Sequence, residues 1–108
     1  MPDLRCVSDK EFLTAVAEGL TLTFFWAPWS RPCKAMLPAL EQAAKELEGR
    51  VKVLKLDVEG NPATPASLGV GSIPALMVFK NGMPMRQAGG LGSASIIRSL
   101  LDPFMDLG

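Results

Sequence analysis

The sequence predicts a single α/β domain over residues 1–108, with a central mixed β-sheet flanked by helices on both faces. Apolar runs of strand character alternate with segments of helical periodicity, at residues 20–26, 51–58 and 75–79. These runs are nearly continuous, which is typical of strands buried on both faces. The pair Asn81-Gly82 then favours a tight hairpin, so the last strand, over 85–88, should return antiparallel. Helical connections together with one hairpin give a mixed sheet.

The N-terminal segment is expected to form a short edge strand over 4–7, in which Cys6 is a small strand side chain. A helix should follow, because Ser8 and Glu11 have the spacing of a capping box. Gly19 is a natural end for this helix. Its expected apolar face consists of Phe12, Leu13 and Val16.

Two further helices and a short one are expected after the central strand. The long helix runs to Leu47 and should kink at Pro38. A short helix over 65–68 should close near Gly69, and Ser93 should cap the last helix. The expected buried positions of the long and last helices are Leu37, Leu40, Ala44, Leu47, Ile96, Ile97, Leu100 and Leu101.

The composition excludes several classes of function. Eleven basic and eleven acidic residues cancel, which argues against nucleic acid or a membrane surface as partner. The chain has no histidine, so Ser-His-Asp catalysis, Cys-His catalysis and imidazole zinc sites are excluded. Two cysteines are too few for a four-cysteine metal site, and we expect no cofactor. Without a signal-peptide pattern or a membrane-length apolar run, we expect a soluble, cytoplasmic monomer.

The segment from Phe24 to Pro38 carries the functional information. Ser30 and Cys33 lie three residues apart where a helix begins, so their side chains share one face of its first turn. Cysteines at this spacing could form a disulfide, and the helix dipole favours a thiolate at the first position. Here that position holds a hydroxyl. Serine is also among the best helix N-caps, worth about 1 kcal/mol, which is a purely structural explanation for it.

Several short motifs occur in the order and at the spacing of one known family. They are Phe25-Trp26-Ala27-Pro28-Trp29, Pro32-Cys33-Lys34, Pro38, Lys55-Leu56-Asp57, Ile73-Pro74, Asn81-Gly82 and Gly89. Together they resemble thioredoxin over nearly the whole chain. The resemblance implies the thioredoxin fold, with a redox-active centre and protein disulfide oxidoreductase activity. It also implies electron transport in cell redox homeostasis, with protein disulfides and a flavoprotein thioredoxin reductase as partners.

The resemblance assigns roles to individual positions. Ser30 stands where an exposed cysteine attacks the substrate disulfide, and Cys33 matches the shielded cysteine that resolves the mixed disulfide. The backbone before Pro74 pairs with an extended substrate, and the Ile73–Pro74 peptide bond is expected to be cis. The residues expected to contact substrate are Trp29, Arg31, Pro32, Ile73, Pro74 and Gly90.

Two positions depart from the family pattern. The hydroxyl of Ser30 is too weakly acidic to act as nucleophile and cannot form a disulfide with Cys33. Phe24 replaces a buried acid that assists proton transfer at the second cysteine, and a phenylalanine there is simply core. Lys55, whose counterpart lies near that acid, is a candidate for proton-transfer support. We favour the alternative that its side chain extends to water.

Three functions fit these residues. The favoured one is a thioredoxin-type disulfide reductase made inactive by serine at position 30, most simply through deliberate substitution. The alternative is a natural Ser-x-x-Cys binding or chaperone module without redox turnover, which Phe24 also fits. The third is a single-cysteine redox protein in which Cys33 or Cys6 forms a mixed disulfide with glutathione or a partner. An exposed Cys33, or a Cys6 close to it, would favour the third.

Overall fold

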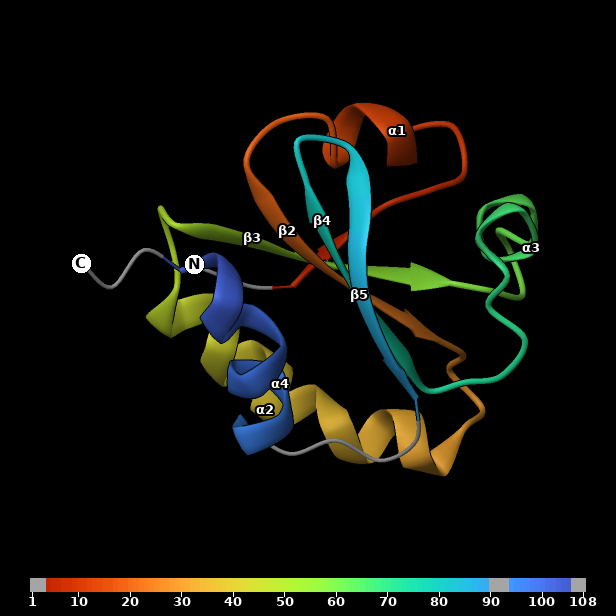
Figure 1. Ribbon diagram of the computed structural model, residues 1–108. Helices are drawn as coiled ribbons and strands as arrows, with labels where there is room; N and C mark the ends of the chain where they lie inside the picture. Colours follow the sequence, from red (N-terminus) through yellow and green to blue (C-terminus); the bar gives the residue numbers. More distant parts are fainter. Residues whose placement is uncertain (1–3, 90–93, 106–108) are drawn as a thin grey trace.

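The computed structural model describes residues 4–89 and 94–105, and its centre is a five-stranded mixed sheet (Figure 1). The strand order is β1-β3-β2-β4-β5. The strands are β1 (Arg5–Cys6), β2 (Leu20–Trp26), β3 (Val51–Asp57), β4 (Ala75–Lys80) and β5 (Met83–Gly89). β1, β3 and β2 run parallel, whereas β4 is antiparallel to both β2 and β5. The predicted mixed sheet is therefore confirmed.

Helices cover both faces of this sheet, as predicted. α2 (Arg31–Glu46) and α4 (Ala94–Leu101) lie together on one face, and α4 continues into a 3-10 turn, η1 (Asp102–Phe104) (Figure 1). α1 (Phe12–Ala15) lies on the other face, and α3 (Ala63–Leu68) lies at one end of the sheet. The central strand β2 sends alternate side chains to the two sides. It thereby contributes to two separate apolar cores.

The two cores differ in what they support. The core on the α2 and α4 side contains Phe24 beside Cys33 and Met36, all fully or almost fully buried. The core on the α1 side is built around aromatic contacts, with the rings of Phe12 and Phe79 packed edge to face at 5.3 Å between centroids. The first core therefore forms the floor beneath the start of α2.

The first helix is shorter than the sequence predicts. Only half of the capping box forms: the Glu11 carboxylate accepts the backbone N–H of Ser8 at 3.0 Å, but the Ser8 hydroxyl donates to that carboxylate instead of capping the helix. α1 ends at Ala15, before Gly19. Gly19, at φ 76°, lies in the turn into β2, where its N–H donates to Asn81 Oδ1 at 2.8 Å. The expected role of Gly19 was therefore wrong.

Two apolar residues expected to be buried are exposed. Leu13 is 77% exposed and Ile96 is 41% exposed. In each helix the buried residues follow the spacing i, i+3, i+4. Leu13 follows Phe12 directly and Ile96 directly precedes Ile97, so each points away from the sheet. The buried residues are Phe12, Ala15 and Val16 in the α1 segment, and Ile97, Leu100 and Leu101 in α4. Neighbouring apolar residues could not all belong to one face.

Most of the local turn chemistry is confirmed. Asn81 and Gly82 both have positive φ, 51° and 86°, as a two-residue hairpin turn requires. α3 ends at Gly69 in the left-handed conformation. α2 continues through Pro38 as one helix. Ser93 lies outside the described residues.

Candidate functional site

The candidate site lies where β2, the central strand, passes into α2. β2 ends at Trp26, and a turn closed by the Ser30 N–H donating to the Ala27 carbonyl at 3.1 Å leads to the start of α2. Pro32 follows in the first turn of the helix, where its missing N–H costs no intrahelical hydrogen bond. The local sequence thus places Ser30 at a helix N-terminus, beside the end of the central strand.

Ser30 and Cys33 are brought together as the spacing predicted. Ser30 is the N-cap of α2, and its Oγ accepts the backbone N–H of Cys33 at 3.3 Å. Cys33 is fully buried, so its thiol is shielded. Ser30 is only 6% exposed, whereas the resemblance implied an exposed position. Its side chain turns toward the helix amide, which accounts for the difference.

The geometry also shows what a thiol could do at position 30. The Cys33 N–H that now donates to the Ser30 hydroxyl would donate to a thiolate in the same place, and the helix dipole would add to that stabilisation. A serine hydroxyl receives the same hydrogen bond but does not ionise near neutral pH. Since the chain has no histidine, the usual activating base for a serine is absent.

Phe24 and Lys55 lie side by side on neighbouring strands beneath this helix start. Phe24 is fully buried in the core that contains Cys33, so it is core, as expected. Lys55 is its direct partner in β3, and the Lys55 ammonium lies 4.8 Å from the centroid of the Trp26 ring. The cation therefore has an aromatic partner in place of an acid. Sequence reasoning missed this contact, although the two residues lie on adjacent parallel strands.

The proline loop approaches the site from the next strand. The Ile73–Pro74 peptide bond is cis, and Pro74 leads directly into β4. β4 pairs with β2 so that Ala75 lies opposite Phe25, close to the end of the central strand. Ile73 is half-buried and packs against both cores. The loop thus lies near the turn that leads to Ser30.

An apolar groove, here called the Trp29 groove, runs between the site and α3. It has a volume of about 340 Å³ and is lined by Trp29, Val58, Pro62, Pro65, Ala66, Val70, Gly71, Ser72 and Ile73. Trp29 is 64% exposed, an unusually high value for so large an apolar side chain. Sequence reasoning identified Trp29 and Ile73 but not the wall supplied by α3. Apolar residues and prolines clustered in a short helix were the available signal.

The remaining predicted contact residues lie elsewhere around the site. Arg31 and Pro32 are exposed on the first turn of α2 and do not line the Trp29 groove. Pro74 is buried. Gly90 lies outside the described residues, so the structure does not place it. The exposed Cys6 lies on the edge strand β1, opposite Lys55 in β3, and is not the buried residue that its apolar segment suggested.

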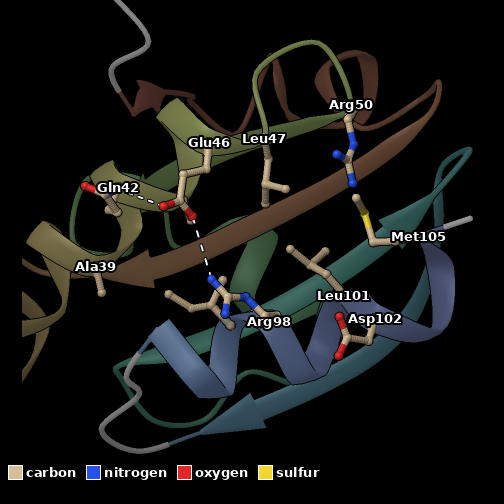
Figure 2. Close-up of a pocket in the computed structure, with 11 residues that line it drawn as sticks. Ala39, Gln42, Glu46, Leu47, Arg50, Arg98, Leu101, Asp102 and Met105 are labelled. Carbon is tan, nitrogen blue, oxygen red and sulfur yellow. Dashed lines mark hydrogen bonds and ion pairs between the residues drawn. The ribbon is translucent and has the colours of Figure 1, made fainter. Parts of the chain in front are cut away.

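A second hollow of about 170 Å³ lies between α2 and α4, shown in Figure 2. It adjoins the C-terminal half of α2, away from Ser30, and Glu46 and Arg98 form an ion pair across it at 3.8 Å. None of the predicted site residues lines it. Within residues 4–89 and 94–105, no cluster of side chains could hold a metal ion, and no helix has the length and apolarity to cross a membrane.

This fold defines a class of protein: α/β domains in which a helix begins at the end of the central strand, beside a cis-proline loop. A thioredoxin family model matches residues 3–102. Thioredoxins from two strains of Staphylococcus aureus, Mu50 and MW2, are each 43% identical over 96 residues, covering 89% of this chain and 92% of theirs. A mutant thioredoxin from Halobacterium salinarum NRC-1 superimposes with a TM-score of 0.88 at 25% identity, covering 99% of this chain and 95% of that one.

The chain belongs to the thioredoxin family. Membership indicates thiol–disulfide oxidoreductase chemistry, since thioredoxins act on protein disulfides and are reduced by thioredoxin reductase. The fold predicted from sequence, the thioredoxin fold, is confirmed.

Proposed function

We propose that this chain has the binding site of a thioredoxin-type protein disulfide reductase but lacks its redox turnover, because serine occupies the position of the attacking cysteine. The main support for this proposal is the pair of residues at the start of α2: Ser30 Oγ accepts the Cys33 N–H at 3.3 Å, and Cys33 is fully buried. The Trp29 groove and the cis-proline loop, which would bind the partner, are present beside this pair. Deliberate substitution at position 30 is the simplest origin of this arrangement.

The chemistry that a cysteine at position 30 would perform follows from this geometry. Its thiolate, held by the Cys33 amide, would attack one sulfur of a substrate disulfide and expel the other as a thiolate. The Cys33 thiolate would then attack the mixed disulfide, forming an internal disulfide and releasing the second substrate thiolate. A reductase would supply two electrons to reopen that bond. An oxygen at position 30 blocks the first of these steps.

Phe24 affects only the proton of the resolving step. In this account the Cys33 thiol must lose its proton before it attacks, and the apolar Phe24 offers no acceptor. Lys55 lies opposite Phe24, and its ammonium lies over the Trp26 ring. The proton would pass to water or to the departing substrate thiolate. We therefore expect slower resolution than attack in a restored dithiol.

Binding uses surfaces that the serine leaves intact. The Trp29 groove offers an apolar side chain of the partner a place beside position 30. Backbone at Ile73, before the cis-proline, would pair with the partner's extended chain. We accordingly assign disulfide-containing proteins and a flavoprotein reductase as partners of the parent protein. Cytoplasmic location, the single domain and the monomeric state stay predictions.

A natural binding or chaperone module is the second candidate. The full burial of Phe24 supports it, because a protein without redox turnover has no use for an acid beneath Cys33. A single-cysteine redox protein has less support, since the thiol of Cys33 is inaccessible and only Cys6 is exposed.

The test is reduction of insulin by dithiothreitol, comparing this chain with its Ser30→Cys variant. We expect the variant to accelerate insulin reduction and the chain to add nothing to the dithiothreitol rate. The double variant Ser30→Cys with Cys33→Ser is the control, and it should trap insulin as a mixed disulfide without turnover. If neither the chain nor the Ser30→Cys variant is active, the binding-module function takes its place.

A further inference from the structure

The start of α3 is capped by a residue from far away in the sequence. The Asp9 carboxylate accepts the backbone N–H of Ala63 at 3.1 Å and that of Thr64 at 2.9 Å. Pro62, at the N-cap position, supplies no side-chain hydrogen bond. Asp9 therefore satisfies amides that the helix itself leaves open.

Asn61 provides a second set of hydrogen bonds in the same region. The backbone N–H of Asp9 donates to Asn61 Oδ1 at 2.9 Å. Asn61 in turn donates to the Asp57 carbonyl, from its own N–H at 3.0 Å and from its side-chain amide at 3.1 Å. The end of β3, the connection to α3 and the segment before α1 are thus held as one unit.

This unit determines where one wall of the Trp29 groove stands. Pro62, Pro65 and Ala66 line the groove, and they flank the two amides that Asp9 holds. Trp29 and Ile73 line the same groove from outside α3. A shift of the first turn of α3 would therefore change the width of the groove directly.

α3 is attached to the rest of the molecule through buried Thr64 and Pro65 and half-buried Leu68, together with the Asp9 cap. It is six residues long, and helices this short are not stable on their own. The Trp29 groove adjoins one side of α3. A different hollow, of about 260 Å³, adjoins its other side, between α3 and α1, and Leu13 and Leu68 are among the residues that line it. Hollows on both flanks leave room for the helix to tilt once its cap is removed.

We propose that Asp9 is a positioning residue for the Trp29 groove: its carboxylate sets the wall formed by α3 and thereby sets the affinity of the site for an extended polypeptide. The inference rests on the proposed function, because it assumes that this groove holds the partner chain. Asp9 itself touches no partner. It acts through Ala63 and Thr64.

The test compares Asp9→Ala and Asp9→Asn with the unsubstituted chain in two measurements. The first is the NMR signals of the Trp29 indole N–H and the Ile73 side-chain methyl groups, which report the groove without any ligand. The second is the dissociation constant for insulin B chain with its cysteines alkylated. We expect Asp9→Ala to shift both sets of signals and to weaken binding roughly fivefold, the factor that corresponds to loss of one ordinary cap. Asp9→Asn, which keeps one acceptor oxygen, should fall between.

Two control variants separate positioning from general destabilisation. Glu11→Gln removes a neighbouring carboxylate that caps the α1 segment by accepting from Ser8. Lys52→Met removes a side-chain donor to the Ala15 carbonyl at 2.7 Å, at the end of α1. Neither residue lines the groove. Both controls should leave the Trp29 and Ile73 signals and the affinity unchanged.

The outcomes are distinguishable. If Asp9→Ala, like Glu11→Gln, changes neither the NMR signals of Trp29 and Ile73 nor the affinity for the alkylated B chain, the positioning role is wrong. If the groove signals move with Asp9→Ala but the alkylated B chain binds to no form of the protein, the proposed function fails while the positioning of α3 stands. If all variants weaken binding alike, the effect is general destabilisation and the positioning role is again wrong.

Discussion

The starts of α2 and α3 solve the same physical problem in opposite ways. Each must satisfy amides that a helix leaves open at its N-terminus. α2 does so locally, with Ser30 capping the amide of Cys33 three residues on. α3 is capped by Asp9, whose carboxylate accepts hydrogen bonds from two amides that lie 54 and 55 residues further along the chain. The local cap fixes the side chain at position 30, whereas in our proposal the distant cap fixes the shape of the groove beside it.

The two regions also differ in what lies beneath them. The start of α2 lies on a closed apolar core in which Phe24 and Cys33 are fully buried. α3 lies between two hollows. Under the proposed function, the sulfur of Cys33 thus lies in the closely packed part of the molecule. The partner chain would bind beside the part that is held by a few hydrogen bonds.

The largest expected effect comes from removing the floor of α2. Phe24→Ala should lower the free energy of unfolding by about 3–5 kcal/mol, because it leaves a cavity beside Cys33. Leu68→Ala, in the half-buried part of α3, is the matched control and should cost much less. Urea unfolding of the two variants measures the difference. Equal losses in the free energy of unfolding would show that α3 is packed as tightly as the start of α2. That result would contradict the proposed difference between the two regions.

A smaller effect is expected from the titration of Asp9. Thr64, together with the backbone N–H of Ala63, lowers the pKa of this carboxyl below its usual value by stabilising its charged form. A carboxyl with a lowered pKa stabilises the fold above its unfolded pKa, near 4, and loses that contribution as pH falls through its folded pKa. The stability difference between the chain and Asp9→Asn should therefore be constant near neutral pH.

Measurements at low pH test whether the charge of Asp9 contributes to the cap. Below about pH 4 the difference between the chain and Asp9→Asn should shrink, because the carboxyl of Asp9 becomes protonated. Unfolding by urea at a series of pH values measures this. A difference that does not change from neutral pH to pH 3 would mean that the charge of Asp9 does not contribute to the cap.

Local features of the molecule were predictable from the sequence, and long-range features were not. The Ser30 cap, the Asn81-Gly82 turn and the left-handed end of α3 at Gly69 each depend on residues within a few positions of one another. The thioredoxin fold was predicted from the resemblance of several short motifs, in their order and spacing, to that family. Asp9 was not identified, because nothing near it in the sequence shows that it meets Thr64.

The predictions that failed did so for the same physical reason. Ser8 and Glu11 have the spacing of a capping box, yet the helix that follows ends at Ala15, and Gly19 is hydrogen-bonded to Asn81 of the distant hairpin turn. Likewise the contact between Lys55 and Trp26 depends on how two strands pair, not on either sequence segment alone. Tertiary packing decided each case.

The central claim is that positions 30 and 33 form an exchange pair that a single atom has silenced. The most direct measurement is to oxidise the Ser30→Cys variant with oxidised glutathione, alkylate the remaining thiols and map them by mass spectrometry. The account predicts an internal disulfide between positions 30 and 33, with one alkyl group, on the exposed Cys6. Alkylation at both position 30 and Cys33 after oxidation, without a disulfide between them, would contradict it.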